Sequence, residues 1–209
     1  MSLSERLRAG ALVLALAVPL ASCGVNTIPT LEETAKARWA DVENQYQRRA
    51  DLIPNLVSTV QGYAKQEKDV LVAVTEARAK ATSIQISADD VTDPDKIAKF
   101  QKAQGELSQG LGRLLATSEA YPELKSNENF LALQSQLEGT ENRITVARRD
   151  YNEAVREYNV TIRTFPAVIA AKVIYGAKPM VPFAAAEGAQ TAPTVSFDTP
   201  APAAKKGAN

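Results

Sequence analysis

The only cysteine of this chain, Cys23, is the residue whose chemistry is easiest to name. It follows a Leu-Ala-Ser tripeptide that closes an apolar run over residues 9–21, and two arginines precede that run. A charged start, a short apolar stretch and small residues before a cut are the parts of an export signal. A cysteine directly after the cut is typical of a bacterial lipobox, where the thiol receives a diacylglycerol and the new N-terminus is acylated, for example with palmitate. We therefore predict a lipoprotein signal peptide over residues 1–22 and a lipid on Cys23.

Two other interpretations of this segment remain open. As a helix, its 13 apolar residues would span only ~20 Å of a hydrocarbon core that is ~30 Å thick, so an uncleaved membrane anchor is less favoured. An ordinary secreted protein with a stray thiol is the other alternative. Two or three acyl chains anchor a protein stably, whereas one chain is marginal. Because Gly24 provides no retention aspartate, we favour the inner leaflet of an outer membrane over the inner membrane.

The composition excludes several kinds of site. The chain has no histidine, which excludes Ser-His-Asp triads, Cys-His pairs and zinc sites with histidine ligands. A single cysteine excludes an intrachain disulfide. The 24 basic and 24 acidic residues balance, and removing the leader leaves one acidic residue in excess. Nucleic-acid binding is therefore not expected, because no basic excess would attract phosphates.

The sharpest polar cluster lies beside a proline. Arg48, Arg49 and Asp51 precede Pro54, and Asn55 follows it. One interpretation is a partner-binding site at a helix kink. The other, which we favour, is structural: Asp51 or Asn55 satisfies backbone groups freed by the proline, and an arginine pairs with an acid on another helix.

The remaining candidates are acids and aromatic residues. Asp150, Glu153 and Glu157 fall at helical spacing, but such a row is more often a solvated face than a cation site. A tryptophan and four tyrosines lie on apolar stripes, which favours core packing over a saccharide platform. A glycosidase needs two acids across a cleft, and a slim bundle offers none. We predict no catalytic residue, metal or cofactor. The aromatic residues concerned are Trp39, Tyr46, Tyr63, Tyr151 and Tyr158.

Apolar residues at steps of three and four predict one long first helix from Leu31 to Ala81. The sequence from Thr30 to Glu33 fits a capping box at its start. The stripe passes through Pro54 in phase, so a kinked but continuous helix, ~75 Å long, is expected.

Two further long helices and a short one follow. Asp93 and Pro94 predict an N-cap and a first helical residue, and Asn127 can cap a third helix whose stripe is close to a coiled-coil heptad. Pro166 should end that helix, and residues 167–175 form a short apolar helix that Gly176 can close. That short helix is either a lid on the bundle or an exposed partner site.

Each helix has one apolar face, so the helices must cover one another. We predict an all-α, elongated antiparallel helical bundle of three long helices plus a short fourth. The predicted domains are a lipidated linker over 23–29, the helical body over 30–180 and a disordered tail over 181–209. The tail is rich in Ala and Pro and cannot bury enough apolar surface to become ordered.

Several motifs in the body resemble the LemA family, and the resemblance covers roughly residues 30–180. They are Ala37–Val42, Arg48–Val57, Gly62–Ala64 with Glu67, Ala77-Arg78, Ala120–Lys125, Leu137–Ile144, Ala147–Asn152, Tyr158-Asn159 and Phe165-Pro166. The resemblance implies an all-helical, membrane-anchored and largely extracytoplasmic protein. It supplies no catalytic residue, because no biochemical function is established for the family. Members typically begin with a transmembrane helix, whereas this chain has a lipobox.

The function we expect is therefore that of a non-catalytic scaffold or adaptor in the cell envelope. Its partners would be the membrane, through the lipid on Cys23, and envelope proteins whose identity the sequence does not give; self-association is left open. The alternative is a cell-envelope enzyme or glycan-binding protein that uses carboxylates and tyrosines of the bundle.

Overall fold

The computed structural model describes residues 26–184 of the 209-residue chain, and every regular element in this part is a helix. The predicted all-α bundle is confirmed, but it has four long helices and not three. The long helices are α2 (Thr27–Tyr63), α3 (Lys68–Ser83), α4 (Pro94–Ser118) and α6 (Glu128–Thr161). The short ones are η1 (Asp90–Thr92), α5 (Pro122–Lys125), α7 (Ala167–Ala170) and the π-helix η2 (Ala171–Tyr175). The signal peptide, Cys23 and the tail from residue 185 lie outside the described residues.

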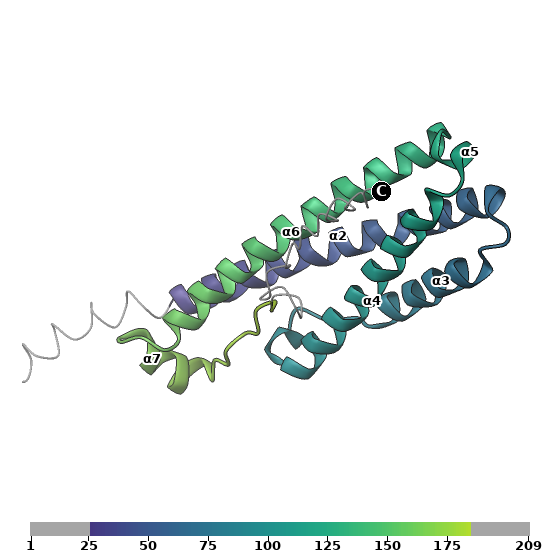
Figure 1. Cartoon of the computed structure of the whole chain (residues 1–209). Coiled ribbons are helices and arrows are strands. Elements are labelled where there is room, and N and C mark those ends of the chain that lie inside the picture. The colour runs from purple at the N-terminus through teal and green to yellow at the C-terminus, as the bar shows by residue number, and fades with distance from the viewer. Residues whose placement is uncertain (1–25, 185–209) are drawn as a thin grey trace, which may run out of the picture.

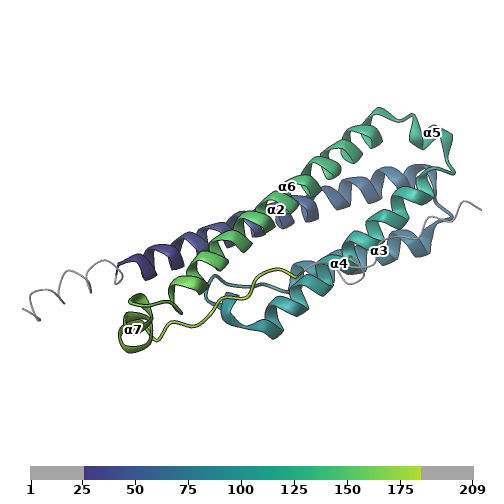
Figure 2. The ribbon, with the colours of Figure 1, turned by 60° about the vertical axis from the view of Figure 1, so that its left-hand side comes forward.

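Two antiparallel pairs make up the bundle. The longest helices, α2 and α6, run side by side in opposite directions, and α3 with α4 forms a second pair packed against them (Figure 1). The short helix α7 lies at the end where α2 begins, and α5 lies at the opposite end (Figure 2). No helix among residues 26–184 is long and apolar enough to cross a membrane.

The prediction of one helix from Leu31 to Ala81 is wrong. The chain does continue through Pro54, as expected, but α2 ends at Tyr63 and α3 folds back from Lys68. Both helices bury their apolar stripes in the same core, where Val60, Ala64 and Leu71 lie together, and the spacing of these residues does not reveal the turn between them. Periodicity alone therefore concealed a hairpin.

Hydrogen bonds between side chains hold this hairpin against the α4–α6 connection. Gln66 Nε2 donates to the Tyr121 hydroxyl at 3.0 Å, and that hydroxyl donates to Glu67 Oε1 at 2.9 Å. Asn127 Nδ2 donates to the Tyr63 hydroxyl at 2.9 Å. These polar residues thus fix the position of the α2–α3 turn against the connection between α4 and α6.

Three predicted caps are confirmed, but α6 ends at Thr161, before the predicted stop at Pro166. The Asp93 carboxylate accepts from the backbone N–H groups of Asp95 and Lys96, with Pro94 as the first helical residue. Asn127 Oδ1 accepts from the Phe130 N–H at 3.0 Å, and Gly176 closes the short apolar helix with φ +56°. The predicted capping box is absent, because α2 already begins at Thr27 and the Thr30 hydroxyl donates to the Asn26 carbonyl.

The buried apolar residues form two clusters along the bundle axis. The first lies around Trp39, Phe100 and Tyr151 near the start of α2, and the second lies around Leu56 and Leu114 toward its end. Ile28, within the expected linker, is fully buried in the first cluster, so the folded body begins before residue 30.

The tail also begins later than predicted. Residues 177–184, which we call the C-terminal strap, run back from η2 along the bundle (Figure 2). Met180 and Phe183 on this strap are buried in the first cluster, and the Val181 N–H donates to the Val91 carbonyl at 2.9 Å. Residues 181–184 therefore pack on the bundle because two large apolar side chains anchor them.

Candidate functional site

Of the four predicted site residues, only Arg49 points into the bundle. It is 2 % exposed, and its guanidinium donates to Gln104 Oε1 at 2.6 Å, to Ser108 Oγ at 2.8 Å and to Glu141 Oε2 at 3.0 Å. A fourth bond reaches the Gln104 carbonyl at 3.3 Å. The group therefore ties together α2, α4 and α6. We call Arg49, Gln104, Ser108 and Glu141 the polar layer.

The other three residues of the cluster are exposed on α2. Asp51 Oδ1 accepts a bond from Gln47 at 2.7 Å, and the Asn55 carbonyl accepts from the Thr59 hydroxyl. Arg48 is exposed on the same helix. The four residues are close in sequence but lie on different faces of α2. Arg49 has a structural role, and the other three are exposed at the surface.

The backbone group freed by Pro54 is satisfied from another helix. A proline at position 54 cannot donate to the Ala50 carbonyl. Arg78 Nε on α3 donates to that carbonyl at 2.7 Å. The expectation that Asp51 or Asn55 would make this repair is wrong, whereas the pairing of an arginine with an acid on another helix is found in Arg49 and Glu141.

Two asparagines on α6 hold the C-terminal strap by its backbone. Asn152 donates to the Phe183 carbonyl at 3.1 Å and accepts from its N–H at 2.8 Å. Asn159 makes the same pair with Met180, at 2.8 and 2.9 Å. Because both amides bind main-chain groups, the asparagine face of α6 is built to hold an extended peptide.

Aromatic side chains complete this seat. The Phe183 ring stacks on Trp39 with centroids 5.6 Å apart and meets the Tyr151 ring edge-on at 5.5 Å. The Arg148 guanidinium lies 4.7 Å from the centre of the Phe183 ring. Burial raises the pKa of Tyr151, whose hydroxyl donates to the Val181 carbonyl at 3.0 Å.

Most of the aromatic residues on the stripes are in the core, as predicted. Trp39, Tyr46, Tyr151 and Tyr158 are buried, so none of them offers a stacking platform for a sugar. Tyr63 is the exception at 42 % exposure, and it lies in the turn at the end of α2.

The carboxylates do not converge. Asp150 pairs with its neighbour Arg149, while Glu153 and Glu157 are exposed, and no group of three or more potential ligands is found within residues 26–184. Glu43 lines a surface cavity of about 430 Å³, and burial raises its pKa. It is the only carboxylate of that lining, so the acid pair of a glycosidase is missing there.

Sequence reasoning missed several residues that the structure brings together. Gln104, Glu141 and Arg78 were not singled out because their partners lie 28 to 92 positions away along the chain. Asn152 and Asn159 carried a usable signal: two asparagines seven residues apart share one helix face, each directly after a buried tyrosine.

Comparisons with known proteins agree with the motifs. The family model described as "LemA family" matches residues 38–197. Magnetosome protein MamQ 2 of Paramagnetospirillum magneticum (strain AMB-1) is 28% identical over 157 residues, which is 68% of this chain and 58% of the relative. Magnetosome protein MamQ of Magnetospirillum gryphiswaldense (strain MSR-1) is 27% identical over the same shares. The chain thus spans a little more than half the length of these curated relatives.

The matched region contains most of α2 and all the later helices, the polar layer and the strap. The ordered motifs, the all-helical fold and the family model agree over the same residues. The chain therefore belongs to the LemA family.

Proposed function

We propose that this LemA-family chain is a lipid-anchored, non-catalytic scaffold or adaptor of the cell envelope. The observation that carries the proposal is that the polar side chains inside the bundle are used to hold its parts together. Arg49, Arg78, Asn152 and Asn159 are all engaged in holding helices and the strap together. What remains for other molecules is a long surface, and long helical faces suit protein partners better than small substrates.

The anchor in this proposal is the lipid on Cys23. Two residues separate Cys23 from Asn26, so chain length alone limits the distance between their Cα atoms to about 11 Å. A lipid there would hold the start of α2 at a bilayer surface, outside the cytoplasm. Gly24 favours the inner leaflet of an outer membrane over the inner membrane.

Arg48, Asp51 and Asn55 are the candidate partner-binding residues. They are exposed on α2, about 30 to 40 Å along the helix from its start. A partner held there would bind at that distance along α2 from the anchored end of the bundle.

Crosslinking in cells tests the scaffold. A photo-crosslinking amino acid at Arg48, Asp51 or Asn55 should trap defined envelope proteins or a second copy. The same amino acid at Lys102, exposed on α4, is the matched control. The same mixture of crosslinked products from all four positions would refute a specific partner-binding surface on α2.

Lipid attachment is tested separately. Cys23→Ser should abolish fatty-acid labelling, and the processed wild-type protein should carry the lipid mass at its N-terminus. A free thiol on the mature N-terminus, or unchanged membrane fractionation of Cys23→Ser, would refute lipid anchoring.

The alternative is an envelope enzyme or glycan-binding protein, and the cavity beside Glu43 is the observation that favours it. A carboxyl with a raised pKa in a cavity is a candidate general acid. Purified protein that cleaves peptidoglycan, and that loses this activity in Glu43→Gln, would replace the scaffold proposal. Exposed Glu153→Gln is the matched control.

A further inference from the structure

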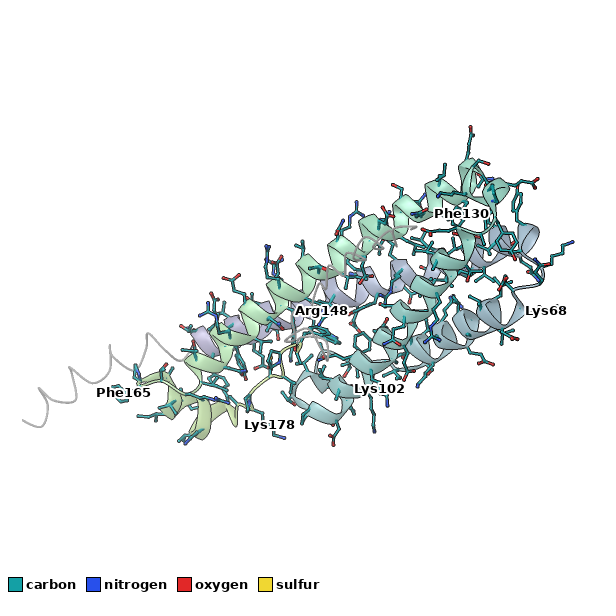
Figure 3. The ribbon with its side chains drawn as sticks, in the orientation of Figure 1. Lys68, Lys102, Phe130, Arg148, Phe165 and Lys178 are labelled. Atoms are coloured by element: carbon teal, nitrogen blue, oxygen red, sulfur yellow. The ribbon has the colours of Figure 1, made fainter. Side chains whose placement is uncertain are left out.

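The end of the bundle where α2 begins carries a group of exposed apolar side chains. Phe165 is 78 % exposed and Val173 is 80 % exposed, and the rest of the group lies on α7 and η2 between them or next to them. Figure 3 places Phe165 at the outer tip of this end. We call the group the apolar cap; its members are Phe165, Ile169, Val173, Ile174 and Tyr175.

The short helical segment over α7 and η2 buries its small residues and exposes large apolar ones, the reverse of a normal surface helix. Its buried residues are Ala167, Ala170 and Ala171, while Ile169, Val173 and Ile174 are exposed. Burial of an Ile or Val side chain yields about 1.5–3 kcal/mol, much more than burial of an alanine methyl. The fold therefore leaves its largest local apolar surface for something outside the described part of the chain.

The segment that carries the cap is basic, and Glu32 on the neighbouring first turns of α2 is paired with Lys36 at 3.1 Å. Residues 158–184 contain Arg163, Lys172 and Lys178 and no acidic residue, although the chain as a whole is balanced. Figure 3 shows Lys178 on the same end of the molecule as Phe165. Apolar side chains surrounded by lysine and arginine are the combination that binds the interface of an anionic bilayer.

The position of the apolar cap in the fold also fits contact with a bilayer. Ile28, at the start of α2, lies in one buried cluster with Ala167 and Ala170 beneath the cap. Because only two residues separate Cys23 from Asn26, an extended chain keeps their Cα atoms within about 11 Å of each other. A lipid on Cys23 would therefore bring the cap to the membrane without any further change in the fold.

We propose that the apolar cap inserts into the headgroup region of an anionic bilayer and forms a second contact beside the lipid anchor. This inference rests on the proposed lipid anchoring at Cys23. A second copy of the chain is a poorer occupant, because two caps face to face would bring together basic groups of the same sign. The second contact would fix the direction of the bundle relative to the membrane, which a flexible lipid tether alone does not do.

The test uses the processed, acylated full chain. Cys23 is the only cysteine and its thiol would carry the lipid, so an introduced cysteine is the single free thiol. Val173→Cys receives an environment-sensitive fluorophore, and Val72→Cys, 53 % exposed on α3, is the matched control. Both proteins are reconstituted into phosphatidylcholine vesicles with or without phosphatidylglycerol, and circular dichroism checks that the variants fold as the wild type does.

In vesicles with phosphatidylglycerol, the label at 173 should shift to the blue, be quenched by nitroxide-bearing lipid and be protected from aqueous acrylamide. The label at 72 should show none of these changes. The double variant Lys172→Gln/Lys178→Gln should lose most of the effect at 173.

The failures can be told apart by flotation. If the protein floats with vesicles but the label at 173 behaves like that at 72, the lipid anchor stands and the cap proposal is overturned. Protein that does not float with either vesicle overturns both. An equal shift without phosphatidylglycerol overturns the assignment to an anionic surface, and acrylamide protection before vesicles are added identifies a second copy as the occupant and overturns the proposal.

Discussion

Replacement of the buried Arg49 should destabilise the bundle, although the residue is charged. Its guanidinium is buried and makes four hydrogen bonds, of which the bonds to the Gln104 side chain and carbonyl are buried. In Arg49→Met, which keeps an apolar stem, those two acceptors lose a charged donor. A hydrogen bond to a charged group contributes about 1.5–3 kcal/mol.

Two effects reduce the loss in the free energy of unfolding that these hydrogen bonds would cause. Glu141 is about half exposed at 55 %, so its carboxylate can be hydrated after the change and its share is small. The variant also avoids the cost of removing a guanidinium from water, which is several kcal/mol for a buried ion. We therefore expect Arg49→Met to lower the free energy of unfolding by about 2–3 kcal/mol.

The assay is urea unfolding followed by circular dichroism, with the slope of the transition compared between variants. Glu141→Gln should lower the free energy of unfolding by less than about 1 kcal/mol. Arg48→Met, on the exposed side of the same helix, should stay within about 0.5 kcal/mol of the wild type. In Arg49→Met/Gln104→Leu part of the loss should return, because the orphaned acceptor is removed. A loss in Arg49→Met no larger than that in Glu141→Gln would refute the role assigned to the polar layer.

Two further predictions concern the proline and an acidic group. Arg78→Met should lower the free energy of unfolding by about 1–2 kcal/mol, because the Ala50 carbonyl loses its donor. In a Pro54→Ala background, residue 54 regains an N–H, so the same change should cost clearly less; equal costs in both backgrounds, measured by urea titration, would contradict the repair. The hydrogen bond from Lys96 lowers the pKa of Asp90 from 3.8 to about 2. The stabilisation by this carboxylate is thus complete above pH about 4 and lost as the pH falls toward 2, so the difference in unfolding free energy between wild type and Asp90→Asn should vanish over that interval; a difference that does not change with pH would contradict the pairing.

Periodicity predicted where the helices lie, but not how they are connected. Residues with special backbone roles, such as Asp93, Asn127 and Gly176, gave correct boundaries because their effects are local. The break after Tyr63 depends on contacts with Tyr121 and its neighbours, which are remote in sequence. A pattern that repeats every three to four residues cannot report such contacts.

The candidate site was predicted only in part for the same reason. The sequence identified Arg49 and the need to repair the backbone near Pro54. It did not identify Gln104, Glu141 or Arg78 as the partners, because α4, α6 and α3 bring them in from elsewhere. The inward direction of Arg49 next to the outward Arg48 became visible only once the faces of α2 were assigned.

The polar layer also explains how a bundle of such regular stripes keeps a single alignment. The polar layer lies between the two apolar clusters. Along α2, Tyr46 belongs to the first cluster, Arg49 follows it in the polar layer, and Ile53 belongs to the second cluster. A shift of α4 by one heptad would place Ile97 or Leu111 where Gln104 now accepts from Arg49, and the guanidinium would be buried beside an apolar side chain.

A corresponding shift of α6 in one direction would replace Glu141 by Arg148, a charge of the same sign. A shift of either helix would also change the aromatic contacts of Trp39 with Phe100 and Tyr151, whereas the Leu and Ile positions of the second cluster could be refilled by similar side chains. A buried charge left without a partner costs several kcal/mol, a large share of the stability of a typical domain. The arginine at the boundary of the two clusters therefore adds to the aromatic contacts of Trp39 in selecting one alignment, and that alignment in turn places the asparagines of α6 opposite the strap and the apolar cap at the end where α2 begins.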